Sequence, residues 1–82
     1  MNKPIQYIKL IFKSKDEKEI YNINCLKTEK ISSVIRKLKD KIADENYYSL
    51  ELIFNSKNID DSEEEKRAQE LGIKDNSTIY FY

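Results

Sequence analysis

The 82 residues of this chain provide one domain, because a chain this short needs most of its apolar residues for a single core. Hydrophobic residues make up 39% of the sequence and charged residues 37%, and the periodic spacing of the apolar ones excludes a disordered chain. The net charge is zero, and no apolar run is long enough to predict a membrane span.

The first predicted elements are two strands joined by a polar turn. Residues 8–12 alternate between core and solvent positions, and residues 21–25 alternate again. Between them lies the charged stretch SKDEKE, residues 14–19. Two adjacent strands across about six polar residues predict a hairpin.

The single cysteine, Cys25, falls on the inward face of this hairpin, where we expect it to be a small buried hydrophobe. A nucleophilic thiol would need a histidine base, and the sequence contains no histidine. One cysteine cannot form an internal disulfide, and no signal-peptide pattern follows Met1. We therefore expect a reducing compartment, the cytosol or the nucleus.

An apolar stripe at helical spacing predicts an amphipathic helix from about residue 29 to 43. Thr28 or Ser32 could cap its first turn. We expect the helix to end in the polar stretch 44–46. The stripe consists of Ile31, Val34, Ile35, Leu38 and Ile42.

Residues 50–54 predict a third strand with two different faces. One face holds Leu50, Leu52 and Phe54, and the other holds Glu51 and Ile53. A turn at 55–57 and a brief strand at 58–59 follow.

The rest of the chain predicts a surface loop, a helical turn and a last strand. Residues 60–67 are acidic, which favours the loop, and residues 68–73 predict the turn, ended by Gly72 as a left-handed cap. Residues 77–82 close the chain as a strand. Its inward side chains are Ile79 and Phe81, and its outward side chains are Tyr80 and Tyr82.

This order predicts an α+β fold in which one main helix covers one face of a mixed five-stranded sheet, the arrangement called a β-grasp. The chain resembles ubiquitin and its relatives over residues 8–82. The resemblance is carried by LELIFNSKNID (residues 50–60) and LGIKDNSTIYFY (residues 71–82), with the hairpin and helix in matching order. We expect a single domain, residues 1–82, with its core in about 7–82.

The resemblance implies a protein-binding patch on the exposed sheet face. Its central isoleucine matches Ile53, the lysine beside it matches Lys57, and Tyr80 and Tyr82 match the last-strand positions. Independently of the resemblance, exposed aromatics around an aliphatic centre are typical of interface hot spots. The alternative is that the tyrosines only pack across strands and that Ile53 is an ordinary surface residue.

Three departures from ubiquitin bear on function. The turn SKDEKE lacks the leucine of the family's patch, and Glu51 stands where ubiquitin has a basic residue. We therefore expect acidic helices that suit ubiquitin to bind poorly. The sequence ends at Tyr82 without a Gly-Gly tail, so we expect a domain built into a larger protein.

Catalytic function is disfavoured, because no pair of nucleophile and base and no Gly-rich phosphate loop is present. The run Glu63–Glu65 lacks the spacing of a calcium loop, so we expect solvated charge, with no metal and no cofactor. The first half of the chain is basic, but its helix lacks interleaved aromatics, which argues against a nucleic-acid site.

We expect a monomeric, non-catalytic interaction domain of the ubiquitin–proteasome pathway. Its partners would be ubiquitin-binding helices or proteasome receptor-like domains, with no membrane involved. Two alternatives remain open. One is a protein modifier released or transferred from a precursor, for which a fused splicing domain is one route. The other is a β-grasp scaffold subunit of a larger assembly.

Overall fold

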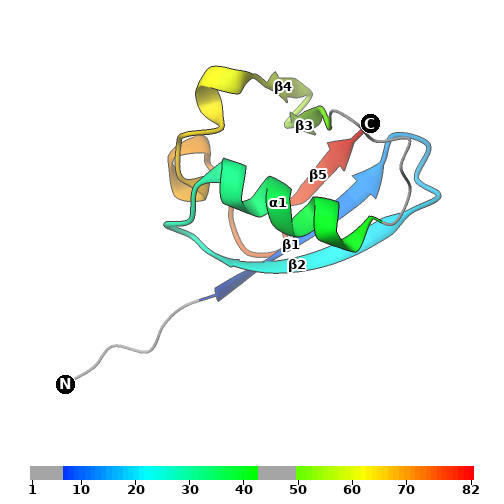
Figure 1. Ribbon diagram of the computed structural model, residues 1–82, viewed down its shortest axis with the longest axis horizontal. Helices are drawn as coiled ribbons and strands as arrows, with labels where there is room; N and C mark the ends of the chain where they lie inside the picture. The colour runs from blue at the N-terminus through cyan, green and yellow to red at the C-terminus, as the bar shows by residue number, and fades with distance from the viewer. Residues whose placement is uncertain (1–6, 43–49) are drawn as a thin grey trace.

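The elements of the folded chain follow the predicted order, strand–strand–helix–strand–strand–short helix–strand (Figure 1). The computed structural model describes residues 7–42 and 50–82. Its strands are β1 (Tyr7–Ser14), β2 (Ile20–Leu26), β3 (Leu52–Phe54), β4 (Lys57–Ile59) and β5 (Thr78–Phe81). Its helices are α1 (Ile31–Lys41) and the two short 3₁₀ segments η1 (Asp61–Glu63) and η2 (Ala68–Leu71).

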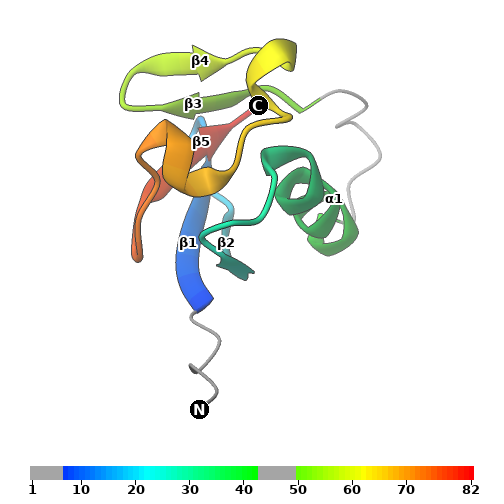
Figure 2. The same ribbon diagram turned by 90° about the vertical axis from the view of Figure 1, so that its left-hand side faces the viewer.

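The five strands form one mixed sheet in the order β2-β1-β5-β3-β4. β1 and β5 are parallel, and the other neighbouring pairs are antiparallel. Figure 2 shows α1 on one side of this sheet, and no helix of the described residues lies on the other side. The β-grasp fold expected from the sequence is confirmed.

The first hairpin is longer than predicted, because β1 continues to Ser14. The Ser14 hydroxyl is buried and donates a hydrogen bond of 2.6 Å to the Asp16 carboxylate. It also accepts one of 3.0 Å from the Glu19 backbone N–H. Because the Ser14 hydroxyl both donates and accepts a hydrogen bond, it can be buried at the end of the strand. Ser14 therefore belongs to the sheet and not to the predicted turn.

The start of α1 differs from the prediction. The helix begins at Ile31, and neither Thr28 nor Ser32 caps it, since the N-cap residue is Lys30 and makes no side-chain cap bond. The free amides of its first turn are satisfied from a distant segment instead. The Ile31 N–H donates to the Lys66 carbonyl at 3.0 Å, and the Ser32 N–H donates to the Glu64 carbonyl at 2.9 Å.

The C-terminal end of α1 lies at Lys41, with Ile42 as its cap residue. The predicted stop at residues 44–46 lies outside the described residues. The four buried residues of α1 are those of the predicted stripe, namely Ile31, Val34, Ile35 and Leu38.

Two turns in the second half depend on left-handed backbone. Asn55 (φ 54°) and Ser56 (φ 63°) form a two-residue connection between β3 and β4. Gly72 (φ 79°) caps η2 as predicted, and its N–H bonds the Ala68 and Gln69 carbonyls. The predicted loop at 60–67 contains η1, whose Asp60 and Glu63 form a reciprocal capping box.

The core lies between α1 and the facing side of the sheet. Cys25, Ile79 and Phe81 are fully buried there, as predicted, and the Tyr21 ring packs against Phe81 with centroids 6.0 Å apart. Among the described residues, no buried side-chain nitrogen or oxygen lacks a hydrogen-bond partner. One face of the sheet therefore packs against α1, and within residues 7–42 and 50–82 no helix covers the opposite face.

Candidate functional site

Four predicted site residues meet on the sheet face that points away from α1. Ile53 of β3 lies directly opposite Tyr80 of β5. One step further along, Glu51 and Tyr82 exchange two backbone hydrogen bonds of 3.0 and 3.1 Å. Paired residues of a ladder point to the same side, so we call Glu51, Ile53, Tyr80 and Tyr82 the β3–β5 patch.

Burial confirms the side on which this patch lies. Ile79 and Phe81, which alternate with the two tyrosines, are completely buried against the core. Ile53 and Tyr80 are half-buried, and Tyr82 keeps 40% of its surface exposed. An aliphatic side chain is thus flanked by aromatic rings on a face that no helix in the described part of the chain covers.

The turn of the first hairpin contacts both tyrosines of the patch. The Tyr80 hydroxyl donates a hydrogen bond of 3.1 Å to the Glu17 carboxylate, which raises the pKa of Tyr80 because the phenolate would lie beside a negative charge. The Lys15 ammonium lies 4.7 Å from the centre of the Tyr82 ring, within the range of a cation–π contact. The two rings are therefore held at the surface by charged neighbours.

Lys57, the fifth predicted site residue, lies apart from the patch. It is paired with Phe54, and Ile53 is paired with Asn58, so Lys57 and Ile53 point to opposite sides of the β3–β4 hairpin. Lys57 lines a hollow of about 190 Å³ with Phe54, Ile59, Glu63 and Leu71, among others. The structure thus brings four of the five predicted residues together.

The family to which this chain belongs follows from its sequence. Residues 5–81 match the family described as "Ubiquitin carboxyl-terminal hydrolases, Ubiquitin-like 1". The chain is a member of this ubiquitin-like family. A search among curated proteins finds no matching sequence.

Solved structures support the same fold for this ubiquitin-like domain. The ubiquitin-like domain of an Arabidopsis thaliana protein superposes with a TM-score of 0.79 at 18% identity, covering 95% of this chain and 78% of that one. ATBAG1, solved in complex with HSP70, gives 0.75 at 16% identity and covers 92% and 39%. A protein designed on the basis of ubiquitin gives 0.74 at 13% identity and covers 93% and 87%.

Two residues on the open face of the ubiquitin-like domain were missed by sequence reasoning. Ile20 begins β2 and is 57% exposed, and it lies opposite Lys13 of β1. Lys13 in turn is the register neighbour of Tyr80. The available signal was an isoleucine next to a charged turn, one residue before the predicted start of the strand.

Chemically reactive groups in the described part of the domain are engaged in structural roles. Burial raises the pKa of the Cys25 thiol to about 11, with the Glu29 carboxylate adding to the effect, so the thiol stays protonated at neutral pH. Glu63 belongs to the capping box, and Glu65 pairs with Lys30 at 3.3 Å. Burial and the adjacent Asp61 raise the pKa of Glu64.

No group of three potential metal-ligating side chains occurs within residues 7–42 and 50–82. In the same described ranges, no helix has the length and apolar character needed to cross a membrane.

Proposed function

We propose that this ubiquitin-like domain is a non-catalytic interaction module within a larger protein of the ubiquitin–proteasome pathway. The β3–β5 patch would be its partner-binding surface. The observation that carries the proposal is the direct pairing of Ile53 with Tyr80, with Tyr82 next to them, on the one sheet face that α1 leaves open. The match to a ubiquitin-like family described from ubiquitin hydrolases supports the pathway.

A suitable partner is an amphipathic helix or a small receptor domain with an apolar anchor. Partly exposed aromatic residues lose little conformational entropy on binding and contribute strongly to hot spots. The Tyr80 and Tyr82 rings are already held by Glu17 and Lys15, which reduces the ordering cost further. We expect the domain to act as a monomer in the cytosol or the nucleus.

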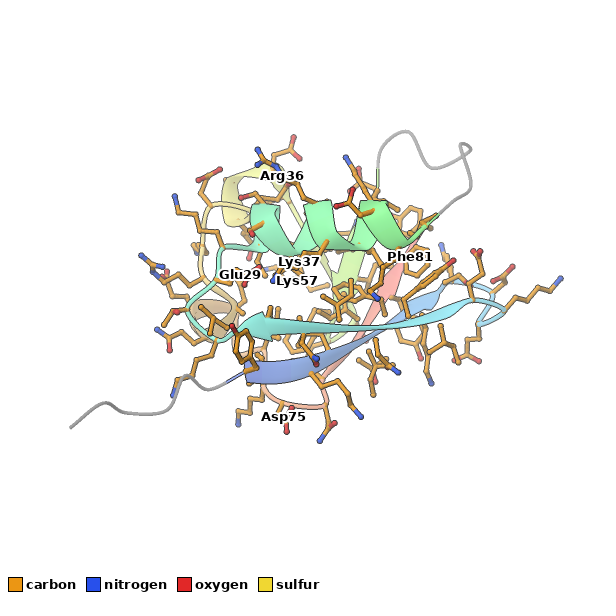
Figure 3. The ribbon with its side chains drawn as sticks, turned by 60° about the horizontal axis from the view of Figure 1, so that its bottom comes forward. Glu29, Arg36, Lys37, Lys57, Asp75 and Phe81 are labelled. Atoms are coloured by element: carbon orange, nitrogen blue, oxygen red, sulfur yellow. The ribbon has the colours of Figure 1, made fainter. Side chains whose placement is uncertain are left out.

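The test is an NMR titration of isotope-labelled domain with ubiquitin-binding helices and with proteasomal receptor domains. We expect chemical-shift changes centred on Ile53, Tyr80 and Tyr82. The Ile53→Ala variant should bind roughly tenfold more weakly or worse, as for a hot-spot residue. Arg36→Ala is the matched control, because Arg36 is exposed on the side of α1 away from the sheet (Figure 3).

Shift changes that cluster around α1 and spare the β3–β5 patch would contradict this function. Equal loss of affinity in Ile53→Ala and Arg36→Ala would contradict it as well. The loss would then not depend on whether the substitution lies on the open sheet face or on α1.

A further inference from the structure

The open face continues beyond the β3–β5 patch, across β1 to the outer strand β2. The register places Ile20 opposite Lys13, Lys13 beside Tyr80, and Tyr80 opposite Ile53. These four residues form one row that crosses four strands, and we call it the cross-strand row. Ile20, at its far end, is 57% exposed although it is aliphatic.

The lysines of β1 give this half of the face a positive charge. Lys9 and Lys13 point outward from alternate positions of β1, and Lys15 follows directly after the strand. No ion pair joins any of the three to another described residue, and Lys15 instead contacts the Tyr82 ring. The nearby acidic residue Glu17 already accepts the Tyr80 hydroxyl.

Besides Glu17, the face has a negative charge on the side of β3. Glu51 stands opposite Tyr82 on the β3 side, two strands from Lys9 and Lys13, while the Lys15 ammonium contacts the Tyr82 ring between them. A partner that reached only the β3–β5 patch would meet this carboxylate and Lys15, whereas a partner that extended across β1 would also meet Lys9 and Lys13.

We propose that the binding surface extends along the cross-strand row to Ile20, and that its occupant is an amphipathic helix of a partner protein with acidic residues over the β1 lysines. This inference rests on the proposed function. It adds Ile20 as a second apolar anchor and a negative charge on the partner. Adjacent strands lie about 4.8 Å apart, so the row from Ile20 to Ile53 spans roughly 14 Å. At 1.5 Å per residue, about ten residues of helix match that distance.

The apolar stripe of such a helix would contact the two isoleucines and Tyr80. Its flanking carboxylates would lie next to Lys13 and Lys15, and the side chain nearest Glu51 would be neutral or basic. Since the four residues of the cross-strand row all lie in paired strands, we expect the partner to dock without rearrangement of the domain.

The test uses two synthetic helical peptides of about 15 residues with the same leucine stripe at i, i+3, i+7 and i+10. One peptide carries Glu at the flanking positions, and its twin carries Lys. We expect the Glu peptide to bind the domain at least about tenfold more tightly. The variant Lys13→Glu should reverse this preference, because the Lys peptide then meets a carboxylate.

The isoleucine anchor is tested with Ile20→Ser. We expect it to weaken binding of the Glu peptide about tenfold and to leave the NMR dispersion of the folded domain intact, because the side chain is mostly exposed. Tyr7→Ser is the matched control. Tyr7 is 61% exposed on the same strand pair but lies opposite Leu26, at the far end of β1 from Lys13.

The outcomes separate this inference from the proposed function. If Ile53→Ala weakens binding while Ile20→Ser and Lys13→Glu do not, the partner occupies the β3–β5 patch alone and the extension is wrong. If Ile20→Ser weakens binding and Ile53→Ala does not, the β3–β5 patch is not the binding surface and the proposed function fails. Equal binding of the two peptides would contradict the proposal that the partner helix is acidic. Absence of binding by both would contradict the proposal that the cross-strand row is a binding surface.

Discussion

At the scale of single residues, two neighbours in β3 have opposite roles. Leu52 is 2% exposed in the core, and Ile53 is half-buried on the open face. We predict that Leu52→Ala lowers the free energy of unfolding by about 2–5 kcal/mol, because it removes buried volume from a close-packed core. Ile53→Ala should lower it by less than about 1 kcal/mol. Urea denaturation of both variants measures the difference.

The two variants serve as controls for one another, since each removes the same kind of aliphatic side chain from an adjacent position. A loss in Ile53→Ala as large as that in Leu52→Ala would show that Ile53 belongs to the core. The β3–β5 patch would then lose its apolar centre.

The alternation of β3 and β5 was sufficient to predict which residues face the core and which face solvent. The alternation could not predict the face of the β3–β4 hairpin on which Lys57 lies. The sequence predicted a turn at residues 55–57, but the connection is formed by Asn55 and Ser56 alone, so Lys57 enters β4 opposite Phe54. A shift of one residue moves a side chain to the other face of a strand. The length of the turn therefore determines the face on which Lys57 lies.

At the scale of elements, the β3–β4 turn is strained in a way that a substitution can relieve. Ser56 has a φ of 63°, a conformation that costs a side-chain-bearing residue about 1 kcal/mol or more and costs glycine little. We predict that Ser56→Gly raises the free energy of unfolding by about 0.5–1 kcal/mol. Part of the gain is offset, because glycine also increases the entropy of the unfolded chain.

The opposite substitution at Gly72 is the matched control for this turn. Gly72 has a φ of 79°, and a Cβ added there would meet no atom within 4 Å. Gly72→Ala should therefore destabilise by about 1 kcal/mol through backbone conformation alone. Thermal unfolding of the two variants checks both signs, and a destabilised Ser56→Gly would contradict the argument.

The start of α1 shows why some element boundaries could not be predicted from the sequence. Sequence reasoning sought a local hydroxyl cap at Thr28 or Ser32, but carbonyls of Glu64 and Lys66 satisfy the first amides of α1. These groups are about 30 residues away in sequence. Only the folded chain brings them to the helix, so no local pattern could have indicated them.

At the scale of the whole molecule, one partly buried polar cluster connects the helix layer to the sheet. Figure 3 shows Glu29 and Lys37 between α1 and the end of β2. The Glu29 carboxylate accepts hydrogen bonds from the Leu26 N–H at 3.3 Å and the Ser33 hydroxyl at 3.0 Å, and it pairs with Lys37 at 2.9 Å. The Lys37 ammonium also donates to the Asn24 carbonyl at 3.3 Å, so both layers are joined through one charge pair.

This cluster makes the stability of the domain depend on pH. Burial alone would raise the pKa of Glu29, but the bonds from Lys37, Leu26 and Ser33 outweigh it and lower the pKa below its usual 4.5. The unfolded state therefore binds the proton first as pH falls. The stabilisation is complete above pH 4.5 and is lost as pH falls through the lower folded-state pKa.

We predict that Glu29→Gln lowers the free energy of unfolding by about 1 kcal/mol at neutral pH, a value reduced for the partial exposure of Lys37. The difference from the wild type should shrink as pH falls below 4.5, since the unfolded wild-type chain is protonated first and the folded carboxyl becomes neutral only at its lower pKa. Glu70→Gln is the matched control, because its exposed pairing with Arg67 at 4.0 Å contributes little. Denaturation curves over this pH range measure the difference. A gap between Glu29→Gln and wild type that stays constant into acid would mean that the carboxylate charge does not join helix and sheet.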